Sequence, residues 1–428
     1  MPSYGYYVVV HRKMDWIVPG YRPFEDRRRR EAGQTMSHHV NRRWEGDPGA
    51  PGGRRARKSF SYDAFVPDRI ADLSPTLRLD VAERIFEATH SIELAATAGP
   101  EGALEAVGSL LLHAEARASS LIEGITISQR NLARALLDPR IARGDPHLVI
   151  ADVRATEESI HIATHAEQLQ IDHILDLHRT LMAQVDYARP GGFRTTQNWI
   201  GRSSTSPEAA DFIPPPETEV VPLMEDLVVF MGRDDLPAVA QAAIAHAQFE
   251  TIHPFIDGNG RVGRCLVQLI LRRCGVATFT PPVSLILASV GQAYIDGLVT
   301  YRDGDLSDWC DLFAEACAHA GTASTELAAR VRALEADWSE AAGRPRRGST
   351  AARVIALLAR YPVLDAALVR DGLKVDVRRA IEALELLTRT GVLHRLGSQA
   401  RNRRYEAIAL FELVSTFEQD VASGQLGR

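Results

Sequence analysis

The chain reads, from residue 253 to residue 264, His-Pro-Phe-Ile-Asp-Gly-Asn-Gly-Arg-Val-Gly-Arg. Residues 236–252, which precede this stretch, are alanine-rich and contain no helix breaker after Pro237, so they are predicted to form a helix. Residues 265–271 form an apolar run that only Gln268 interrupts, which is typical of a second, buried helix. The stretch is therefore expected to form a tight loop whose last residues begin the second helix.

The glycines and arginines of this loop indicate an anion site. Gly258, Asn259 and Gly260 reach left-handed backbone angles at low cost, so their N–H groups can turn inward as a nest. The N-terminus of the following helix adds a partial positive charge and free N–H donors, which suit a phosphate group. Arg261 and Arg264 are three residues apart, so they share a helix face and can both donate to phosphate oxygens. All five residues are predicted to bind the phosphates of a nucleotide.

Two other loop residues carry different chemistry. Asp257 offers a hard carboxylate oxygen, which suits Mg²⁺ that also takes phosphate oxygens and keeps waters. His253, at the loop entrance, has a side chain that titrates near neutrality, as a general base requires. The loop lacks the Gly-Lys-Ser/Thr ending of a P-loop, and it follows a helix rather than the strand of a dinucleotide-binding fold. The pattern indicates a nucleotide-phosphate site with a base beside it.

His-Pro-Phe-x-Asp-Gly-Asn-Gly-Arg-x-x-Arg is the signature of Fic-domain proteins (filamentation induced by cAMP), and residues 253–264 match it at every defined position. Residues 190–200, 212–216 and 245–250 also resemble segments of the Fic core, so the resemblance covers roughly residues 60 to 320. It implies a mainly α fold with a Fic-type helical core. It also implies a protein adenylyltransferase that transfers AMP from ATP, with Mg²⁺, to a Ser, Thr or Tyr hydroxyl of a protein.

Residues 119–125, Ser-Ser-Leu-Ile-Glu-Gly-Ile, resemble the inhibitory motif of this family, Ser/Thr-x-x-x-Glu-Gly/Asn. Ser119 and Glu123 are four residues apart on one helical face, and Gly124 can serve as the helix C-cap. The resemblance implies that Glu123 pairs with Arg264 and keeps this arginine from the γ-phosphate. We expect a bidentate carboxylate–guanidinium pair, which would leave a bound nucleotide misaligned for attack.

The region between the first Fic-like segment and the loop is expected to contact the target. The segment with Arg194 and Asn198 resembles one near the active site of the family, although their roles are less transferable than those of the loop. Residues 200–216 end in a proline triplet, which is typical of an extended segment. The resemblance implies a short β-hairpin flap here, which adds the target peptide as a strand and presents its hydroxyl to His253. An ordinary connector is the alternative.

The end of the chain shows a separate pattern. Residues 351–360, 364–372 and 375–389 are predicted as short helices, and residues 391–395 and 403–407 alternate like a β-hairpin with a basic loop between them. This order is that of a winged helix-turn-helix domain, which can bind DNA or another protein. The arginines available to DNA phosphates are Arg378, Arg379, Arg389, Arg401, Arg403 and Arg404.

The chain of 428 residues is long enough for two or three domains. We predict a disordered basic tail or a start assigned too early (1–58), a helical region with the inhibitory helix (59–165), the Fic catalytic core (166–325), a helix and linker (326–348), and the winged-helix domain (349–412). The tail carries 13 basic and 6 acidic residues, so an arm that binds nucleic acid or a membrane surface is the alternative.

Composition sets outer limits on function. The formal net charge of −6 argues against a chain built wholly for nucleic acid, although one basic module remains compatible with it. The cysteines, Cys265, Cys274, Cys310 and Cys317, form no Cys-x-x-Cys pair and lie in apolar contexts, so buried free thiols and a cytoplasmic location are expected. The sequence contains no apolar run of about eighteen residues, so no membrane span is predicted.

Three hypotheses for function follow from these patterns. The first is a protein adenylyltransferase that Glu123 inhibits and that modifies another protein or itself. The second is an enzyme that removes AMP with the same site, in which Glu123 positions water. The third is a DNA-binding regulator whose Fic core senses a nucleotide. The sequence leaves open the target, the signal that frees Glu123, the preference for the nucleotide base, and the oligomeric state, including a homodimer.

Overall fold

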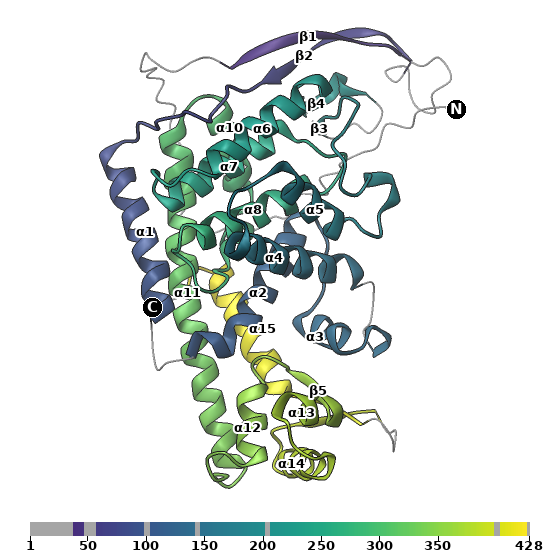
Figure 1. The fold of residues 1–428 in the computed structure, drawn as a ribbon, viewed down its shortest axis with the longest axis vertical. Helices are drawn as coiled ribbons and strands as arrows, with labels where there is room; N and C mark the ends of the chain where they lie inside the picture. Colours follow the sequence, from purple (N-terminus) through teal and green to yellow (C-terminus); the bar gives the residue numbers. More distant parts are fainter. Residues whose placement is uncertain are drawn as a thin grey trace.

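The computed structural model describes residues 37–46, 57–97, 103–141, 146–201, 206–397 and 403–425. Within these residues the chain is mainly helical, as predicted, with short strands at both ends of an elongated molecule (Figure 1). The helices are α1 (Leu79–Thr97), α2 (Ala103–Ile122), α3 (Gln129–Leu137), α4 (His147–His165), α5 (Ile171–Leu181), α6 (Val220–Met231), α7 (Ala238–Ile252), α8 (Asn259–Arg273), α9 (Val283–Val290), α10 (Gln292–Arg302), α11 (Leu306–Ala341), α12 (Thr350–Leu357), α13 (Ala366–Leu373), α14 (Val377–Arg389) and α15 (Ile408–Ala422). The strands are β1 (His38–Trp44), β2 (Phe60–Val66), β3 (Ile200–Gly201), β4 (Ala210–Phe212), β5 (Val363–Asp365), β6 (His394–Leu396) and β7 (Arg404–Glu406).

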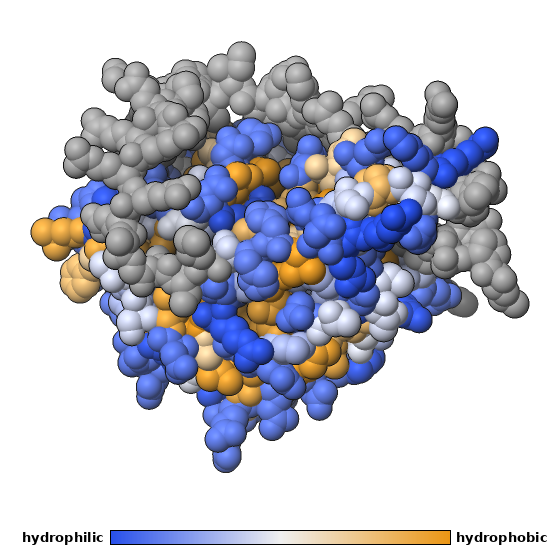
Figure 2. Space-filling view, turned by 90° about the horizontal axis from the view of Figure 1, so that it is seen from above, coloured by the Kyte–Doolittle hydropathy of each residue, from blue (hydrophilic) through white to orange (hydrophobic). Residues whose placement is uncertain are grey.

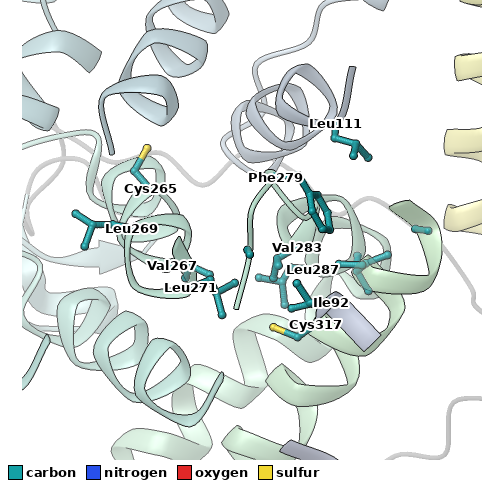
Figure 3. Packing of buried hydrophobic residues seen from close by; sticks show 14 of the residues in the cluster. Ile92, Leu111, Cys265, Val267, Leu269, Leu271, Phe279, Val283, Leu287 and Cys317 are labelled. Atoms are coloured by element: carbon teal, nitrogen blue, oxygen red, sulfur yellow. The ribbon is translucent and has the colours of Figure 1, made fainter. Parts of the chain in front are cut away.

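Helices α7 and α8 lie at the centre of the molecule. Every residue of α7 is buried, because α1, α6, α8, α10 and α11 all pack around it. Its many alanines allow these neighbours to approach closely, and this packing accounts for the alanine-rich sequence. The apolar face of α8 joins the same core. Figure 3 shows Leu271 of α8, Val283 of α9, Ile92 of α1 and Cys317 of α11 gathered in one cluster.

Helix α11 is one continuous helix of 36 residues, about 54 Å long at 1.5 Å per residue. Helix α1 lies along it and buries Val81, Ile85, Ala88 and Ile92. The two backbones approach closely at Gly321, where a β-carbon would lie only 2.5 Å from the Ser91 hydroxyl. The domain boundary that we expected between residues 325 and 326 falls inside α11. The predicted core and the predicted helix and linker are therefore joined by one continuous helix rather than by a loop.

The last part of the chain forms a small unit of helices and strands at the lower end of Figure 1. Helices α12, α13 and α14 pack against one another, and α13 contacts β5 of a three-stranded antiparallel sheet of order β5-β7-β6. Asp365 and Asp376 accept N–H groups at the starts of α13 and α14, which explains why these helices begin there. Leu364, which we expected to begin a helix, lies in β5 instead.

Helix α15 extends beyond the predicted end of this unit at residue 412. It returns toward the helical body and packs against α11, α9 and α3 (Figure 1). Strand β7 also faces α3, where Glu406 accepts hydrogen bonds from Arg130 and Arg134, the latter at 2.8 Å. The C-terminal unit is therefore anchored to the helix that follows residues 119–125.

The prediction of disorder up to residue 58 is wrong for residues 38–44. These residues form β1, which pairs with β2 over seven residues at the upper end of Figure 1. The hairpin packs on the segment before α6, because Trp44 contacts Trp199 edge-to-face and Arg42 pairs with Glu217 at 2.9 Å. Residues 1–36 and 47–56, which include the basic cluster at 27–30 and most of that at 54–58, lie outside the described residues.

Figure 2 shows the face at the hairpin end of the molecule, where hydrophilic and hydrophobic residues are interspersed outside the grey areas. No single helix in the described ranges is long and apolar enough to cross a membrane, although the bent pair α9 and α10 passes this test jointly. All four cysteines are free, as expected, and Cys265, Cys310 and Cys317 are buried. Cys274 is exposed, so the expectation of a buried thiol is wrong there.

Candidate active site

The predicted loop reverses the chain between α7 and α8 through two left-handed residues. His253 ends α7 with φ 49° and ψ 59°, and Gly258 precedes α8 with φ 83°. A β-carbon at Gly258 would lie 2.9 Å from the sulfur of Met182, so glycine is required there for space as well as for conformation. The predicted helix–loop–helix is present.

Buried side chains hold the main chain of the loop. Asn198 donates to the carbonyl of Phe255 at 3.0 Å, and Arg194 donates to that of His253 at 2.9 Å. The side chain of Asn259 accepts the N–H of Phe255 at 2.8 Å and donates to its carbonyl at 2.9 Å. The side chain of Asn259 is thus used inside the loop. The group that Asn259 can offer a phosphate is its main-chain N–H, which is the group that we predicted.

His253 is 4% exposed, and neither of its ring nitrogens has a hydrogen-bond partner within the described ranges. Burial lowers the pKa of this imidazole to about 3, and the positive charges of Arg194 and Arg302 act in the same direction. The side chain is therefore neutral near pH 7, which is the form that accepts a proton.

The carboxylate of Asp257 is oriented from two sides. The Tyr187 hydroxyl donates to Oδ2 at 2.6 Å, and the N–H of Gly258 donates to Oδ1 at 2.6 Å. Each oxygen keeps a lone pair, and the side chain is 25% exposed, so the carboxylate is able to bind a cation. Burial and the neighbouring Asp257 raise the pKa of Tyr187 to about 12, so its hydroxyl keeps the proton that it donates.

His178 contacts the loop at Phe255 and at the main chain of Asp257. Its ring stacks on Phe255 with centroids 3.7 Å apart, and its Nδ1 accepts the N–H of Gly191 at 3.0 Å. Nε2 must then carry the proton that it donates to the Asp257 carbonyl at 3.1 Å. Burial lowers the pKa of His178 to about 4, which keeps the ring neutral.

The side chains near Asp257 decide whether this site suits Mg²⁺. No group of three or more His, Cys, Asp or Glu side chains that could hold a metal ion occurs in the described part of the chain. Mg²⁺ commonly uses one or two carboxylates and takes its other ligands from phosphates and water. Asp257, beside an anion site, fits that chemistry as the protein ligand.

Arg261 is a buried guanidinium with unused donors. It is 4% exposed, and its Nε and Nη1 have no hydrogen-bond partner among the residues that the structure describes. Its Nη2 lies 3.4 Å from the sulfur of Met182 and 3.9 Å from Oδ1 of Asp257. Because unpaired donors on a buried charge are costly, this side chain is suited to receive an anion.

Arg264, in contrast, is occupied by the end of α2. Its Nε donates to the Ser119 hydroxyl at 3.0 Å, and its Nη2 donates to the Ser119 carbonyl at 2.9 Å and to Oε1 of Glu123 at 2.8 Å. Burial opposes the charge, but Glu123 raises the pKa of Arg264 above its usual value. The predicted pair is present, although Ser119 rather than a second carboxylate oxygen accepts the other donors.

The Glu123 carboxylate also lies against the start of α8. A β-carbon at Gly260 would be 2.1 Å from Oε1 of Glu123, so only glycine leaves room for this oxygen. The first turn of a helix carries a partial positive charge that attracts anions. Glu123 therefore lies in the place where the N-terminus of α8 would attract a phosphate.

The turn after α2 is held from several sides. Gly124 has φ 78°, as expected of a helix C-cap, and the Ser120 hydroxyl donates to the buried Asp152 at 2.8 Å. Arg117 bridges this turn to α15, because it donates to the Ile127 carbonyl at 2.9 Å and to Glu418 at 2.5 Å. The position of Glu123 thus depends on α4 and on the C-terminal helix.

Residues 168–271, which include α5, α7 and most of α8, match the model of the Fic/DOC family. This part of the chain is similar to a Fic/DOC domain. Every predicted loop residue lies in it, whereas the predicted inhibitory residues Ser119, Glu123 and Gly124 lie outside the matched range and reach it through Arg264.

Known proteins are similar over the same region. The chain is 33% identical over 131 residues to the protein adenylyltransferase fic-1 of Caenorhabditis elegans, covering 30% of this chain and 23% of that protein. It is 30% identical over 203 residues to the protein adenylyltransferase Fic of Drosophila grimshawi, covering 45% of this chain and 39% of that protein. The chain thus spans less than two fifths of the length of these curated relatives.

A solved structure extends the likeness in fold. A Fic family protein from Desulfovibrio desulfuricans G20 matches 78% of this chain and 97% of its own, with a TM-score of 0.50 and 21% sequence identity. This likeness reaches beyond the matched Fic/DOC domain, and at that identity it concerns the fold alone.

The supporting residues of the Fic/DOC domain had weaker sequence signals than the loop. His178 and Tyr187 belong to none of the motifs identified in the sequence. Tyr294 is buried and hydrogen-bonds to His246 at 2.8 Å, so it belongs to the core. The distance along the chain between Tyr187 and Asp257 concealed their contact.

Proposed function

We propose that this chain is a protein adenylyltransferase that moves AMP from ATP to a hydroxyl group of a protein. The observation that carries the proposal is the arrangement of the loop. It holds a neutral His253 and an Arg261 whose Nε and Nη1, like the ring nitrogens of His253, have no hydrogen-bond partner among the described residues, and Asp257 lies between them in the sequence. The similarity to curated protein adenylyltransferases supports the same activity. Transfer of label from ATP carrying a labelled α-phosphate is the experiment that tests it.

In the proposed reaction, the phosphates lie on the main-chain N–H groups of residues 258–260, with Arg261 donating to their oxygens. His253 takes the proton from the target hydroxyl, and the oxygen bonds to the α-phosphorus. The bond from this phosphorus to the β-phosphate oxygen breaks, and pyrophosphate leaves. Mg²⁺ bound at Asp257 would neutralise phosphate charge. Positioning and charge neutralisation then provide most of the acceleration.

Replacing Asp257 with asparagine is expected to lower transfer by at least about 100-fold, because the residues that merely orient metal ligands already account for about 10–100-fold. Labelling as a function of Mg²⁺ concentration measures this effect. Tyr187→Phe is the matched control: it removes the hydrogen bond to Oδ2 but keeps the charge, so the loss should be smaller. An Asp257→Asn variant with the rate and Mg²⁺ dependence of the parent would contradict this role.

We further propose that Glu123 keeps the enzyme inactive. While Glu123 occupies the start of α8 and binds Arg264, this arginine is not available to the γ-phosphate. The charged hydrogen bond has one fully buried partner, so it is worth roughly 1.5–3 kcal/mol. A contact of this strength is enough to favour the inhibited state, in which Glu123 binds Arg264, by about 10- to 100-fold.

The bridge from Arg117 to α15 is expected to strengthen this inhibition. Glu418→Gln removes the negative partner that Arg117 contacts at 2.5 Å, so the turn that carries Glu123 loses one support. Transfer should rise by a few-fold, less than in a variant without Glu123. Asp420→Asn on the same helix is the matched control: Asp420 pairs with Arg330 of α11 rather than with α2, and its loss should leave transfer unchanged. Equal labelling in both variants would exclude a role for this bridge.

The proposal for target binding rests on β3 and β4. These strands pair antiparallel from Ile200 to Phe212, in the segment that we proposed as a flap. We propose that they bind the main chain of a target peptide near His253. The target is a protein with a Ser, Thr or Tyr hydroxyl, including this chain itself.

We propose that residues 349–412 form a winged helix-turn-helix domain, because three helices that pack against one another adjoin the sheet β5-β7-β6 through α13. DNA binding by this unit stays a prediction. Four of the six arginines proposed for it are paired with carboxylates: Arg378 with Glu382, Arg379 with Asp376, Arg403 with Glu385, and Arg404 with Asp138. Arg401 lies outside the described residues. The C-terminal unit offers fewer free cations to phosphates than its sequence suggests.

A further inference from the structure

Arg194 makes an unusual set of contacts beneath the loop. The residue is 2% exposed, and its Nε donates to the His253 carbonyl at 2.9 Å. Nη1 donates to the Thr196 carbonyl at 3.1 Å, and Nη2 donates to the Pro215 carbonyl at 2.5 Å. Its own main-chain N–H donates to the Pro254 carbonyl at 2.9 Å. Within the described ranges the hydrogen-bond acceptors of this guanidinium are carbonyl oxygens, and no carboxylate there contacts it directly.

These contacts stabilise two features of the main chain at His253. The last carbonyl groups of a helix have no partner inside the helix, and a cation there is favourable. His253 also holds the left-handed conformation, which costs energy for a residue with a β-carbon. Arg194 binds the His253 carbonyl directly and lies 3.4 Å from that of Ile252, so it stabilises both features.

The same guanidinium reaches the base of the flap. Pro215 follows β4 by three residues, and Gln197 donates to the neighbouring Pro214 carbonyl at 2.9 Å. Arg194 therefore connects the segment that leaves the flap with the residue that we propose as the base. A movement of Pro215 would be transmitted to His253 through this one side chain.

We propose that Arg194 is a positioning residue that fixes the His253 main chain against the flap, and that its buried charge beside the same residue disfavours a second positive charge on the imidazole. The proposal rests on the assignment of His253 as the base. It adds a role for a side chain that touches neither the nucleotide phosphates nor the target hydroxyl in the proposed reaction.

The charged groups around His253 support the electrostatic part of this role. Burial is the largest cause of the lowered pKa of His253, and Arg194 is the next, ahead of Arg302 of α10. The main chain of Glu250 acts in the opposite direction and raises this pKa. Glu217 acts on Arg194 from a longer range, and Arg302 is balanced in part by Glu250. Removing the Arg194 charge should therefore raise the pKa of His253.

Two variants separate position from charge, both made in a chain that also carries Glu123→Gly. Arg194→Lys keeps a positive charge, but its single nitrogen cannot reach all three carbonyls that Arg194 contacts through three different nitrogens. Arg194→Gln keeps polar donors but loses the charge. We expect both variants to transfer AMP more slowly, on the order of 10- to 100-fold, because small displacements of a reacting group have effects of this size.

The titration of His253 tests the charge independently of activity. NMR of protein with isotope-labelled histidine, assigned with the help of His253→Ala, gives the midpoint of its protonation. We expect the midpoint to move to higher pH in Arg194→Gln and to stay close to that of the parent in Arg194→Lys. A purely structural role would slow transfer in both variants and leave both midpoints unchanged.

The outcomes are distinguishable. An unchanged midpoint in a folded Arg194→Gln protein, or a parental rate in Arg194→Lys, overturns the proposal. If Arg194→Gln does not fold, Arg194→Lys decides the positional part by its rate. If Glu123→Gly alone transfers no label while the Arg194→Gln midpoint rises, the proposed function fails and the electrostatic role of Arg194 stands.

Discussion

Purified protein with Glu123 replaced by glycine is expected to label itself or a target from ATP about 10- to 100-fold faster than the unmodified chain. The replacement removes the oxygen that Arg264 contacts at 2.8 Å and clears the start of α8, where that oxygen lies against Gly260. A charged hydrogen bond of roughly 1.5–3 kcal/mol corresponds to this factor. Gel autoradiography with label in the α-phosphate, compared with label in the γ-phosphate, measures transfer of AMP specifically.

Two controls establish the cause of the increase. Glu123→Gln keeps the size of the side chain and removes its charge, so it should give an intermediate rate. Adding Arg264→Ala to Glu123→Gly should return labelling to a low level, because the freed arginine is what the variant gains. A loss of activity in Glu123→Gly, measured as slower release of AMP from a labelled protein, would instead favour the removal reaction in which Glu123 positions water.

The loop could be predicted from the sequence because its chemistry lies in consecutive residues. Asp257, Gly258 and Arg261 each have a side chain or backbone conformation whose use follows from residue type and local geometry. The contact of Glu123 with Arg264 spans 141 residues, and it was predicted only because its motif resembles that of a known family. Distance along the chain alone would have concealed it.

The residues that support the loop could not be assigned in this way. Arg194 and Asn198 act on main-chain carbonyl groups, and a carbonyl is the same at every position of the sequence. Asn259 fits the phosphate nest by type, yet its side chain binds Phe255 inside the loop. Such roles depend on which atoms face one another, and this becomes known only when the chain is folded.

The fold shows the same division between local and distant causes. The helices follow from apolar spacing and from caps such as Asp376. The hairpin of β1 and β2 was not predicted, because its first strand is polar and basic. It is stabilised by contacts that lie far along the chain, such as Trp44 with Trp199 and Arg42 with Glu217. Composition alone cannot reveal a strand whose side chains pack on residues 150 or more positions away.

Replacement of His253 is expected to have the largest effect on the reaction itself. In a chain that carries Glu123→Gly, His253→Ala should lower transfer by about 10²- to 10⁴-fold, the range that general bases contribute. The imidazole is neutral and both ring nitrogens are free of other hydrogen bonds among the described residues, so no other contact has to break before it accepts a proton. Labelling under single-turnover conditions measures the chemical step.

The backbone at His253 requires a second variant, because φ is 49° and alanine disfavours this conformation. Asparagine adopts left-handed angles more readily and has no group that takes a proton near pH 7, so His253→Asn separates the loss of the base from strain in the loop. We expect both variants to bind ATP as the parent does, because the proposed phosphate donors, residues 258–261 and Arg264, are unchanged in them. If His253→Asn binds ATP and also transfers AMP at the parental rate, His253 is not the base, and the proton must leave the target hydroxyl by another route.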